Sequence, residues 1–261
     1  MPKSFHIAMV FFGLIRCGEK SWPSIKTNIL DILSQRPSIK FDSFCHTYDL
    51  TKINNPRSKE VNVPIQNALH YAQLLGTITL KIENQEDMVD KHLTLSGYTK
   101  HGDPWNDDDK SLRNLLRQLH SLREATQLWQ NHRHEYDEVV YLRSDLIYYD
   151  PIDMQLFNSF LNQNEDRCII IPKGNDHRGG LNDRFAYGTP TAMEIYGLRG
   201  DWAKEYAQSH MLHSETYLNH VLRSKNVQIL RTNQIALRIR ADGRVEKDKP
   251  VHKKSKSLTH K

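Results

Sequence analysis

The stretch that decides the fold of this chain is Tyr136-Asp137-Glu138-Val139-Val140-Tyr141-Leu142-Arg143-Ser144-Asp145-Leu146. Its centre is a short β-branched and aromatic run, which is typical of a buried parallel strand. Ligands of open α/β sheets sit just beyond the carboxyl ends of such strands. Asp145 is therefore placed where a carboxylate could hold a divalent cation, and Arg143 where a guanidinium could meet an anion. A strand that ends in a solvated Arg/Asp pair explains this stretch equally well.

Strand-like and helix-like segments alternate along the rest of the chain. Residues 5–15 and 41–48 are predicted as strands, and residues 21–35 between them carry isoleucines at helical spacing. A longer apolar helical face covers residues 111–131 and leads into the quoted stretch. This alternation indicates an α/β domain of Rossmann-like type, with a mostly parallel central sheet flanked by helices. We expect a single domain over residues 1–245.

The charge of the chain is unevenly distributed. The formal net charge is +5, but residues 244–261 hold seven Lys and Arg against two acidic residues, so the rest of the chain is balanced. We therefore predict that residues 246–261 form a basic, disordered tail, which touches acidic surfaces only weakly. Residues 51–60 are polar and contain Asn54-Asn55-Pro56, which predicts a loop.

Composition places the chain among soluble globular proteins, with 38% hydrophobic and 26% charged residues. No apolar run reaches the roughly 18 residues that span a bilayer. Residues 7–15 are predicted as the first strand rather than a signal peptide, because Arg16 follows them without a small-residue cleavage site. Three widely spaced cysteines favour a reducing compartment. We therefore expect a cytoplasmic protein.

Several common sites are excluded by their missing motifs. The sequence has no GxGxxG, no GxxxxGK[ST] and no HExxH, which argues against a dinucleotide site, a P-loop and a zinc enzyme. The turn after the first predicted strand nevertheless offers Gly13, where backbone can approach a phosphate, and Arg16, which can pair with one. His46 and Tyr48 end the second strand and could line a base or sugar pocket, although a buried structural histidine is the commoner outcome.

Two further carboxylates lie at the ends of predicted elements. Asp183 is in a glycine-flanked turn with Asn182 and Arg184. Glu215 is in the first turn of a predicted helix, where the helix dipole should keep it ionised and able to deprotonate a hydroxyl. A first-turn acid that merely stabilises its helix is the alternative for Glu215.

Taken together, these segments resemble the small GT-A-type glycosyltransferases of microbial and viral glycan assembly. The resemblance runs from about residue 5 to residue 245 and is carried by residues 12–16, 21–24, 28, 42–48, 114–122, 142–146, 180–188, 213–218 and 238–243. It implies a GT-A-like fold and the transfer of a hexosyl or pentosyl group from a nucleotide-diphosphate sugar to a hydroxyl of a glycan or glycoprotein.

The same resemblance implies roles for individual residues. The donor nucleotide would be bound by Gly13, Arg16, His46, Tyr48, Arg143, Ser144 and Asp145. Asn182 and Arg184 would bind the sugar or the acceptor. Glu215 would be the base of an inverting single displacement, with Asp183 as the reserve candidate. Arg143-Ser144-Asp145 matches the family's DxD position but keeps only the last aspartate, so either Mn²⁺ or Mg²⁺ binds at Asp145 or Arg143 replaces the metal.

Two other functions compete with sugar transfer. A metal-dependent phosphodiesterase or nuclease could use Asp145, Asp183 and the acidic loop at Asp107-Asp108-Asp109. Its two-metal site needs several convergent carboxylates, whereas the strand-end aspartate Asp145 is flanked by Arg143. A non-catalytic protein could bind nucleic acid with the basic tail. The balanced charge of the remaining chain argues against a folded basic groove, so we expect no specific nucleic-acid partner.

Overall fold

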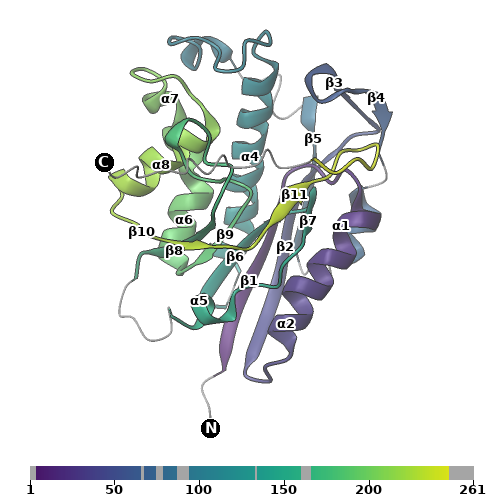
Figure 1. The fold of residues 1–261 in the computed structure, drawn as a ribbon, viewed down its shortest axis with the longest axis vertical. Coiled ribbons are helices and arrows are strands. Elements are labelled where there is room, and N and C mark those ends of the chain that lie inside the picture. Colours follow the sequence, from purple (N-terminus) through teal and green to yellow (C-terminus); the bar gives the residue numbers. More distant parts are fainter. Residues whose placement is uncertain are drawn as a thin grey trace, which may run out of the picture.

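The computed structural model describes residues 4–65, 68–74, 79–86, 94–132, 134–159 and 166–246, and its centre is a sheet of seven strands within those residues (Figure 1). The strands are β1 (Phe5–Phe12), β2 (Ile39–Asp49), β5 (Thr79–Asn84), β6 (Glu138–Arg143), β8 (Cys168–Pro172), β9 (Phe185–Gly188) and β10 (Gln228–Thr232). Their order is β10-β8-β9-β6-β1-β2-β5. Only β9 runs antiparallel to its neighbours β6 and β8 in this sheet. The predicted α/β class with a mostly parallel sheet is confirmed.

The central strands form where the sequence is continuously apolar. Every residue of β6 and of β8 is buried, and β1 is buried except at His6. Strands that are covered on both faces need no polar alternation, which is why short β-branched runs predicted them correctly. The strand of the quoted stretch is paired with β1 in parallel register, with Phe12 opposite Arg143.

Helices cover both faces of this sheet (Figure 1). One face packs against α4 (Lys110–Gln130), α6 (Pro190–Leu198), α7 (Ala203–Tyr206) and α8 (Ser214–Ser224), and the other against α1 (Gly18–Ile25), α2 (Asp31–Ser34) and α5 (Met154–Ser159). The short α3 (Ala68–Leu74) contacts β2 and β5. A π-helical turn, Lys26–Leu30, joins α1 to α2. Short 3-10 turns lie at Pro56–Ser58, Leu95–Gly97, His177–Gly179 and Arg199–Trp202.

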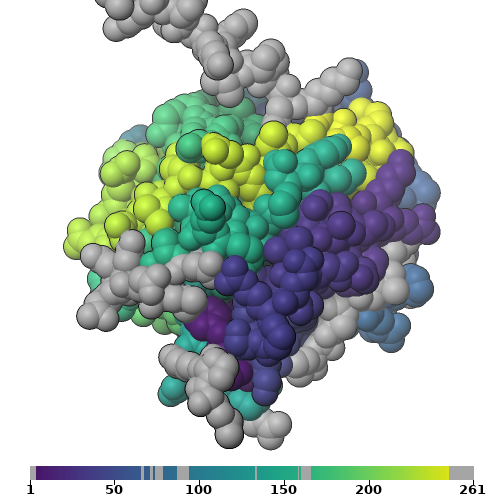
Figure 2. Space-filling model, turned by 60° about the horizontal axis from the view of Figure 1, so that its bottom comes forward, coloured from purple at the N-terminus to yellow at the C-terminus, as the bar shows by residue number. Residues whose placement is uncertain are grey.

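Two small antiparallel pairs lie outside the central sheet. Residues 51–60 are not simply a loop, because β3 (Lys52–Asn55) pairs with β4 (Glu60–Pro64). β7 (Leu146–Tyr148) pairs with β11 (Ala236–Arg238). Figure 2 shows this C-terminal segment in yellow, running beside the teal segment that contains β7 and the purple helices of the N-terminal region. These strands have three to five residues each, and the β7–β11 pair joins segments that are distant in the sequence.

No helix among the described residues is both long and apolar enough to cross a membrane. The predicted tail lies almost entirely outside the described residues, which end at Glu246, so the boundary at residue 245 stays a prediction.

Candidate active site

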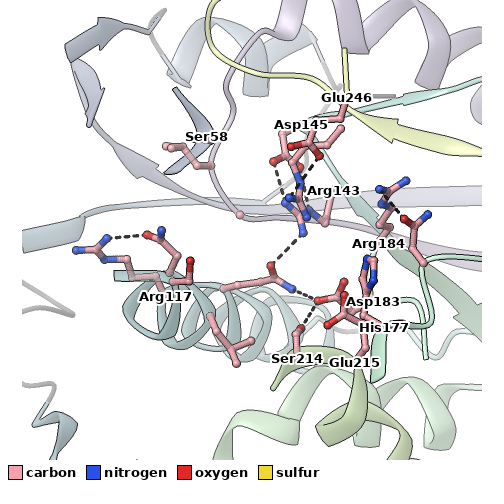
Figure 3. Close-up of a pocket in the computed structure, with 18 of the residues that line it drawn as sticks. Ser58, Arg117, Arg143, Asp145, His177, Asp183, Arg184, Ser214, Glu215 and Glu246 are labelled. Carbon is pink, nitrogen blue, oxygen red and sulfur yellow. Dashed lines mark hydrogen bonds and ion pairs between the residues drawn. The ribbon is translucent and has the colours of Figure 1, made fainter. Parts of the chain in front are cut away.

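A cavity of about 1300 Å³ opens at the carboxyl ends of β1, β6 and β8 (Figure 3). Gly13 and Arg16 follow β1, Arg143 ends β6, and Lys173 follows β8, and all four line the cavity. Further walls come from the first half of α4 and from the start of α8. This is the edge of an open α/β sheet at which ligands bind. The volume exceeds that of a typical pocket for one small ligand.

The structure brings eight of the eleven candidate residues to this cavity. Those that line it are Gly13, Arg16, Tyr48, Arg143, Asp145, Asp183, Arg184 and Glu215. Ser144, Asn182 and His46 are buried and are not part of the lining. The amide of Asn182 donates to the Gly174 carbonyl, and its side-chain oxygen accepts from the Arg184 backbone N–H, so Asn182 shapes the turn.

Gly13 makes the sharp turn after β1. Its φ of +87° lies in the left-handed region that other residues avoid, and an added Cβ would meet nothing within 4 Å. Its backbone N–H donates to the Ser121 hydroxyl at 2.8 Å. The glycine is therefore required for the turn, and its N–H is already bonded to α4.

Two arginines bind the carboxylate of Asp145. The Nε and Nη2 groups of Arg143 donate to its two oxygens at 2.9 and 2.8 Å, and the Arg16 Nε lies 3.2 Å from Oδ2. Burial alone would raise the pKa of Asp145, but Arg143 and then Arg16 hold that pKa well below its usual range. Asp145 is ionised at neutral pH and fixes both guanidinium groups at the cavity wall.

This arrangement does not fit a divalent cation at Asp145. Both of its oxygens already accept from guanidinium groups, and a metal would have to displace one of them. Among the described residues, the groups of three or more possible ligands are Asp42/His132/His134 and His46/Glu83/His120, so candidate ligand groups exist but none includes Asp145 or Asp183. The two-metal carboxylate cluster expected of a phosphodiesterase therefore does not form around these two aspartates.

A glutamine connects the arginine to the second carboxylate. The Arg143 Nη1 donates to the Gln118 side-chain oxygen at 3.0 Å, and the Gln118 Nε2 donates to Asp183 Oδ2 at 3.1 Å. The Ser214 hydroxyl donates to the same oxygen of Asp183. Figure 3 shows this chain of bonds crossing the cavity floor from Arg143 to Ser214. Gln118 was missed as a site residue, since a polar residue on a long helix gives no signal of its own.

Asp183 and Glu215 form a pair of carboxyls with different proton affinities. Burial would raise the pKa of Asp183, but Arg143 and the Ser214 hydroxyl hold it below its ordinary value. Burial, and then the charge of Asp183, raise the pKa of Glu215 to about 8. The expectation that the helix dipole keeps Glu215 ionised is therefore wrong at neutral pH, because desolvation and a neighbouring charge outweigh it.

Close backbone packing brings these two carboxyls together. The Leu181 N–H donates to the Glu215 carbonyl at 2.9 Å, and a Cβ on Gly180 would lie 2.1 Å from the Glu215 carbonyl carbon. The turn that carries Asp183 is thus held directly against the first turn of α8. Only glycine permits this close approach, because any Cβ at position 180 would overlap the backbone of Glu215.

Positive side chains outnumber negative ones around the cavity. The cationic lining residues are Arg16, Arg57, Arg117, Arg143, Lys173, Arg178, Arg184, Arg238 and Arg240. The acidic lining residues are Asp145, Asp176, Asp183, Glu215 and Glu246. Positive and negative residues balance over positions 1–243, yet cationic side chains predominate in the lining of this cavity. Guanidinium groups match phosphate oxygens in charge and geometry, so the cavity suits an anion.

Arg238 gives a more specific indication of an anionic ligand. Its Nε is buried and has no hydrogen-bond partner among the described residues, and its Nη1 lies 3.6 Å from the Glu246 carboxylate. Burial, and then repulsion by Arg143, lower the pKa of Arg238 to about 10, so it remains charged at neutral pH. A buried charged donor without a partner is costly unless a ligand satisfies it.

Comparison with solved structures shows distant likenesses. No family model and no curated protein matches the chain. The apo form of mouse xyloside xylosyltransferase 1 is 13% identical, with a TM-score of 0.42 over 87% of this chain and 84% of that chain. The galactosyltransferase LgtC, solved with donor and acceptor sugar analogues, is also 13% identical, with a TM-score of 0.42 over 86% of this chain and 73% of that chain. A likeness of this degree says nothing of the donor, the acceptor or the mechanism.

Proposed function

We propose that this chain is a GT-A-like glycosyltransferase that moves a hexosyl or pentosyl group from a nucleotide-diphosphate sugar to a hydroxyl of a glycan or glycoprotein. The observation that carries this proposal is the cavity, in which a cluster of guanidinium groups faces a pair of carboxyls. The guanidinium groups can bind the diphosphate of a donor, and a carboxylate can accept the proton of an acceptor hydroxyl. The order of sequence motifs that resembles GT-A enzymes supports the same assignment.

Four arginines are placed to bind the diphosphate. Arg16 and Arg143 are held by Asp145, and Arg238 and Arg240 reach the same cavity from the C-terminal segment. Arg240 is itself positioned by Glu60, which its Nη1 approaches to 3.2 Å and which also binds Arg16. Preorganised cations of this kind stabilise the charge that develops on a departing diphosphate.

We infer that these guanidinium groups replace a metal at the donor site. The residues around Asp145 do not fit Mn²⁺ or Mg²⁺, and the sequence departs from DxD by placing Arg143 where an aspartate would be a ligand. Asp145 then acts on the arginines and not on a cation. The positive charge that a metal would bring is already present in the protein, at fixed positions.

Glu215 is our candidate for the base of an inverting single displacement. The acceptor oxygen forms a bond to the anomeric carbon while the bond from that carbon to the diphosphate oxygen breaks. The diphosphate leaves with the bonding electrons, and the acceptor proton passes to the Glu215 carboxylate. Burial, and then the charge of Asp183, raise the pKa of Glu215, which makes Glu215 the stronger base once it is ionised.

A thermal-shift screen of UDP-, GDP-, CMP- and dTDP-sugars tests this proposal directly. We expect one nucleotide class to raise the melting temperature, equally with EDTA and with Mn²⁺. A ligand at 100 times its Kd stabilises the folded state by ~2.7 kcal/mol. Arg238→Ala should abolish the shift, whereas Arg223→Ala, an exposed arginine on α8, should keep it.

Two results would contradict the proposal in different ways. No shift with any nucleotide sugar would remove the assigned donor class. A shift that needs Mn²⁺ would keep the donor but refute the replacement of the metal by arginines. Release of the nucleoside diphosphate from the stabilising donor, measured with and without candidate glycans, then identifies the acceptor.

A further inference from the structure

A second polar cluster lies beside the cavity without lining it. It joins His46 on β2, Glu83 on β5 and His120 on α4. The Glu83 Oε2 atom is 3.1 Å from His46 Nε2 and 2.7 Å from His120 Nε2. One possible ligand atom from each residue lies within 4.8 Å of the other two. Three elements that are remote in sequence thus converge on one point.

We propose that His46, Glu83 and His120 form a binding site for a divalent transition metal of the zinc type. Two imidazole nitrogens and one carboxylate oxygen favour zinc and its neighbours, whereas Mg²⁺ and Mn²⁺ prefer oxygen ligands. A tetrahedral ion with bonds of ~2.0 Å holds its ligand atoms ~3.3 Å apart. The 3.1 Å separation already approaches this value, and the 2.7 Å separation needs a small shift of the more exposed His120.

The surroundings orient His46 as a ligand. Its ring is fully buried, and its Nδ1 is 2.8 Å from the Ser121 hydroxyl, which leaves Nε2 facing Glu83. Metal-binding histidines are commonly held in this way through their second nitrogen.

The charge balance also favours a cation. The Lys81 ammonium contacts Glu83 Oε1 at 2.6 Å and Glu124 Oε2 at 2.5 Å. Two carboxylates therefore share one lysine, which leaves one negative charge beside the two imidazole rings. The side chain of His120 is 24% exposed, so an ion can enter from solvent.

A metal at this site would be structural. Ser121 bonds both to His46 and to the Gly13 N–H, so the cluster supports the turn after β1 from behind. The ion would fasten β2, β5 and α4 without touching the substrate cavity. This inference does not depend on the proposed sugar transfer and concerns a place other than Asp145.

Metal titration of the tag-free protein tests the inference without any enzyme assay. We expect one Zn²⁺ per chain in competition with a chromophoric chelator, and visible Co²⁺ absorption bands of tetrahedral type, with no binding of Mg²⁺ here. His120→Ala should weaken Zn²⁺ binding about 100-fold or more. Loss of an outer-shell partner of a metal site already weakens binding by about 10- to 100-fold, and His120 is a proposed direct ligand. Glu83→Gln keeps the side-chain shape and should also weaken Zn²⁺ binding.

His134→Ala is the matched control, because His134 is exposed and belongs to the other three-ligand group, Asp42/His132/His134. It should leave Zn²⁺ affinity and the Co²⁺ spectrum unchanged. The inference is overturned if the wild-type protein binds neither ion, if binding survives both His120→Ala and Glu83→Gln, or if it is lost in His134→Ala. Circular dichroism of each variant shows that loss of binding is not loss of fold.

Discussion

Replacing Glu215 by glutamine should change how the stability of the protein depends on pH. The pKa of Glu215 is raised from 4.5 to about 8 in the folded state by burial and by Asp183. As pH rises above 4.5, the carboxyl ionises in the unfolded chain but keeps its proton in the folded one. The contribution of Glu215 to wild-type stability therefore falls between these two pKa values and becomes level above pH 8. Glutamine does not titrate, so the variant lacks this fall.

The size of the effect follows from the two pKa values. At ~1.4 kcal/mol per pKa unit, ionisation of the unfolded chain costs the wild type ~1 kcal/mol at pH 5 and ~3 kcal/mol at pH 7. The side chain is only 15% exposed, so solvent screening does little to reduce these figures. The variant should thus gain ~2.5 kcal/mol over the wild type between pH 5 and pH 7.

Urea unfolding of both proteins at pH 5, 6 and 7, followed by circular dichroism, measures this difference. Taking variant minus wild type at each pH removes the titration of all shared groups. Glu205→Gln is the control, since Glu205 is an exposed acid on α7, and its difference should stay constant. A Glu215→Gln difference that is flat over this range, or that shrinks as pH rises, would refute the assignment of a protonated Glu215.

Three further predictions follow from the site. Gly180→Ala drives a Cβ into the backbone at Glu215 and should destabilise the fold by ~1–3 kcal/mol in urea unfolding; an unchanged midpoint would contradict the packing. Asp145→Asn leaves Arg143 and Arg16 without their shared anion and should cost ~3 kcal/mol; a loss below ~1 kcal/mol would show that the carboxylate does not hold them. Once a donor is identified, kcat/KM should rise about tenfold per pH unit below pH 7 and level above about 8; a pH-independent rate would exclude Glu215 as the base.

The central strands were predicted well because each buried parallel strand is a short, continuous apolar run in the sequence. The apolar runs of β1, β6 and β8 are buried on both faces, and no other arrangement accommodates them as simply. The β3–β4 and β7–β11 pairs escaped prediction. These strands have only three to five residues each, and β7 pairs with a segment that is distant in the sequence, so the pairing could not be read from local patterns.

Some residues of the candidate site were predicted from the sequence, and others were found only in the structure. The rule that ligands bind at the carboxyl ends of strands placed Gly13, Arg16 and the Arg143/Asp145 pair on one cavity. Gln118 and Arg238 could not be placed from residue patterns. They reach the cavity because α4 crosses the sheet and β11 pairs with β7. His46 followed its commoner outcome and became part of a buried network with Glu83.

The sequence by itself determined the α/β class, the central strands and the edge of the sheet where polar residues gather, because these follow from local apolar runs and from where they end. Only the tertiary structure decided the net charge of the cavity at that edge and the pKa values of its carboxyl groups. It gathered cationic side chains around one cavity, bound Asp145 to two arginines, and raised the pKa of Glu215. Burial and the field of charged groups far away in sequence set these properties, and both exist only after the chain has folded.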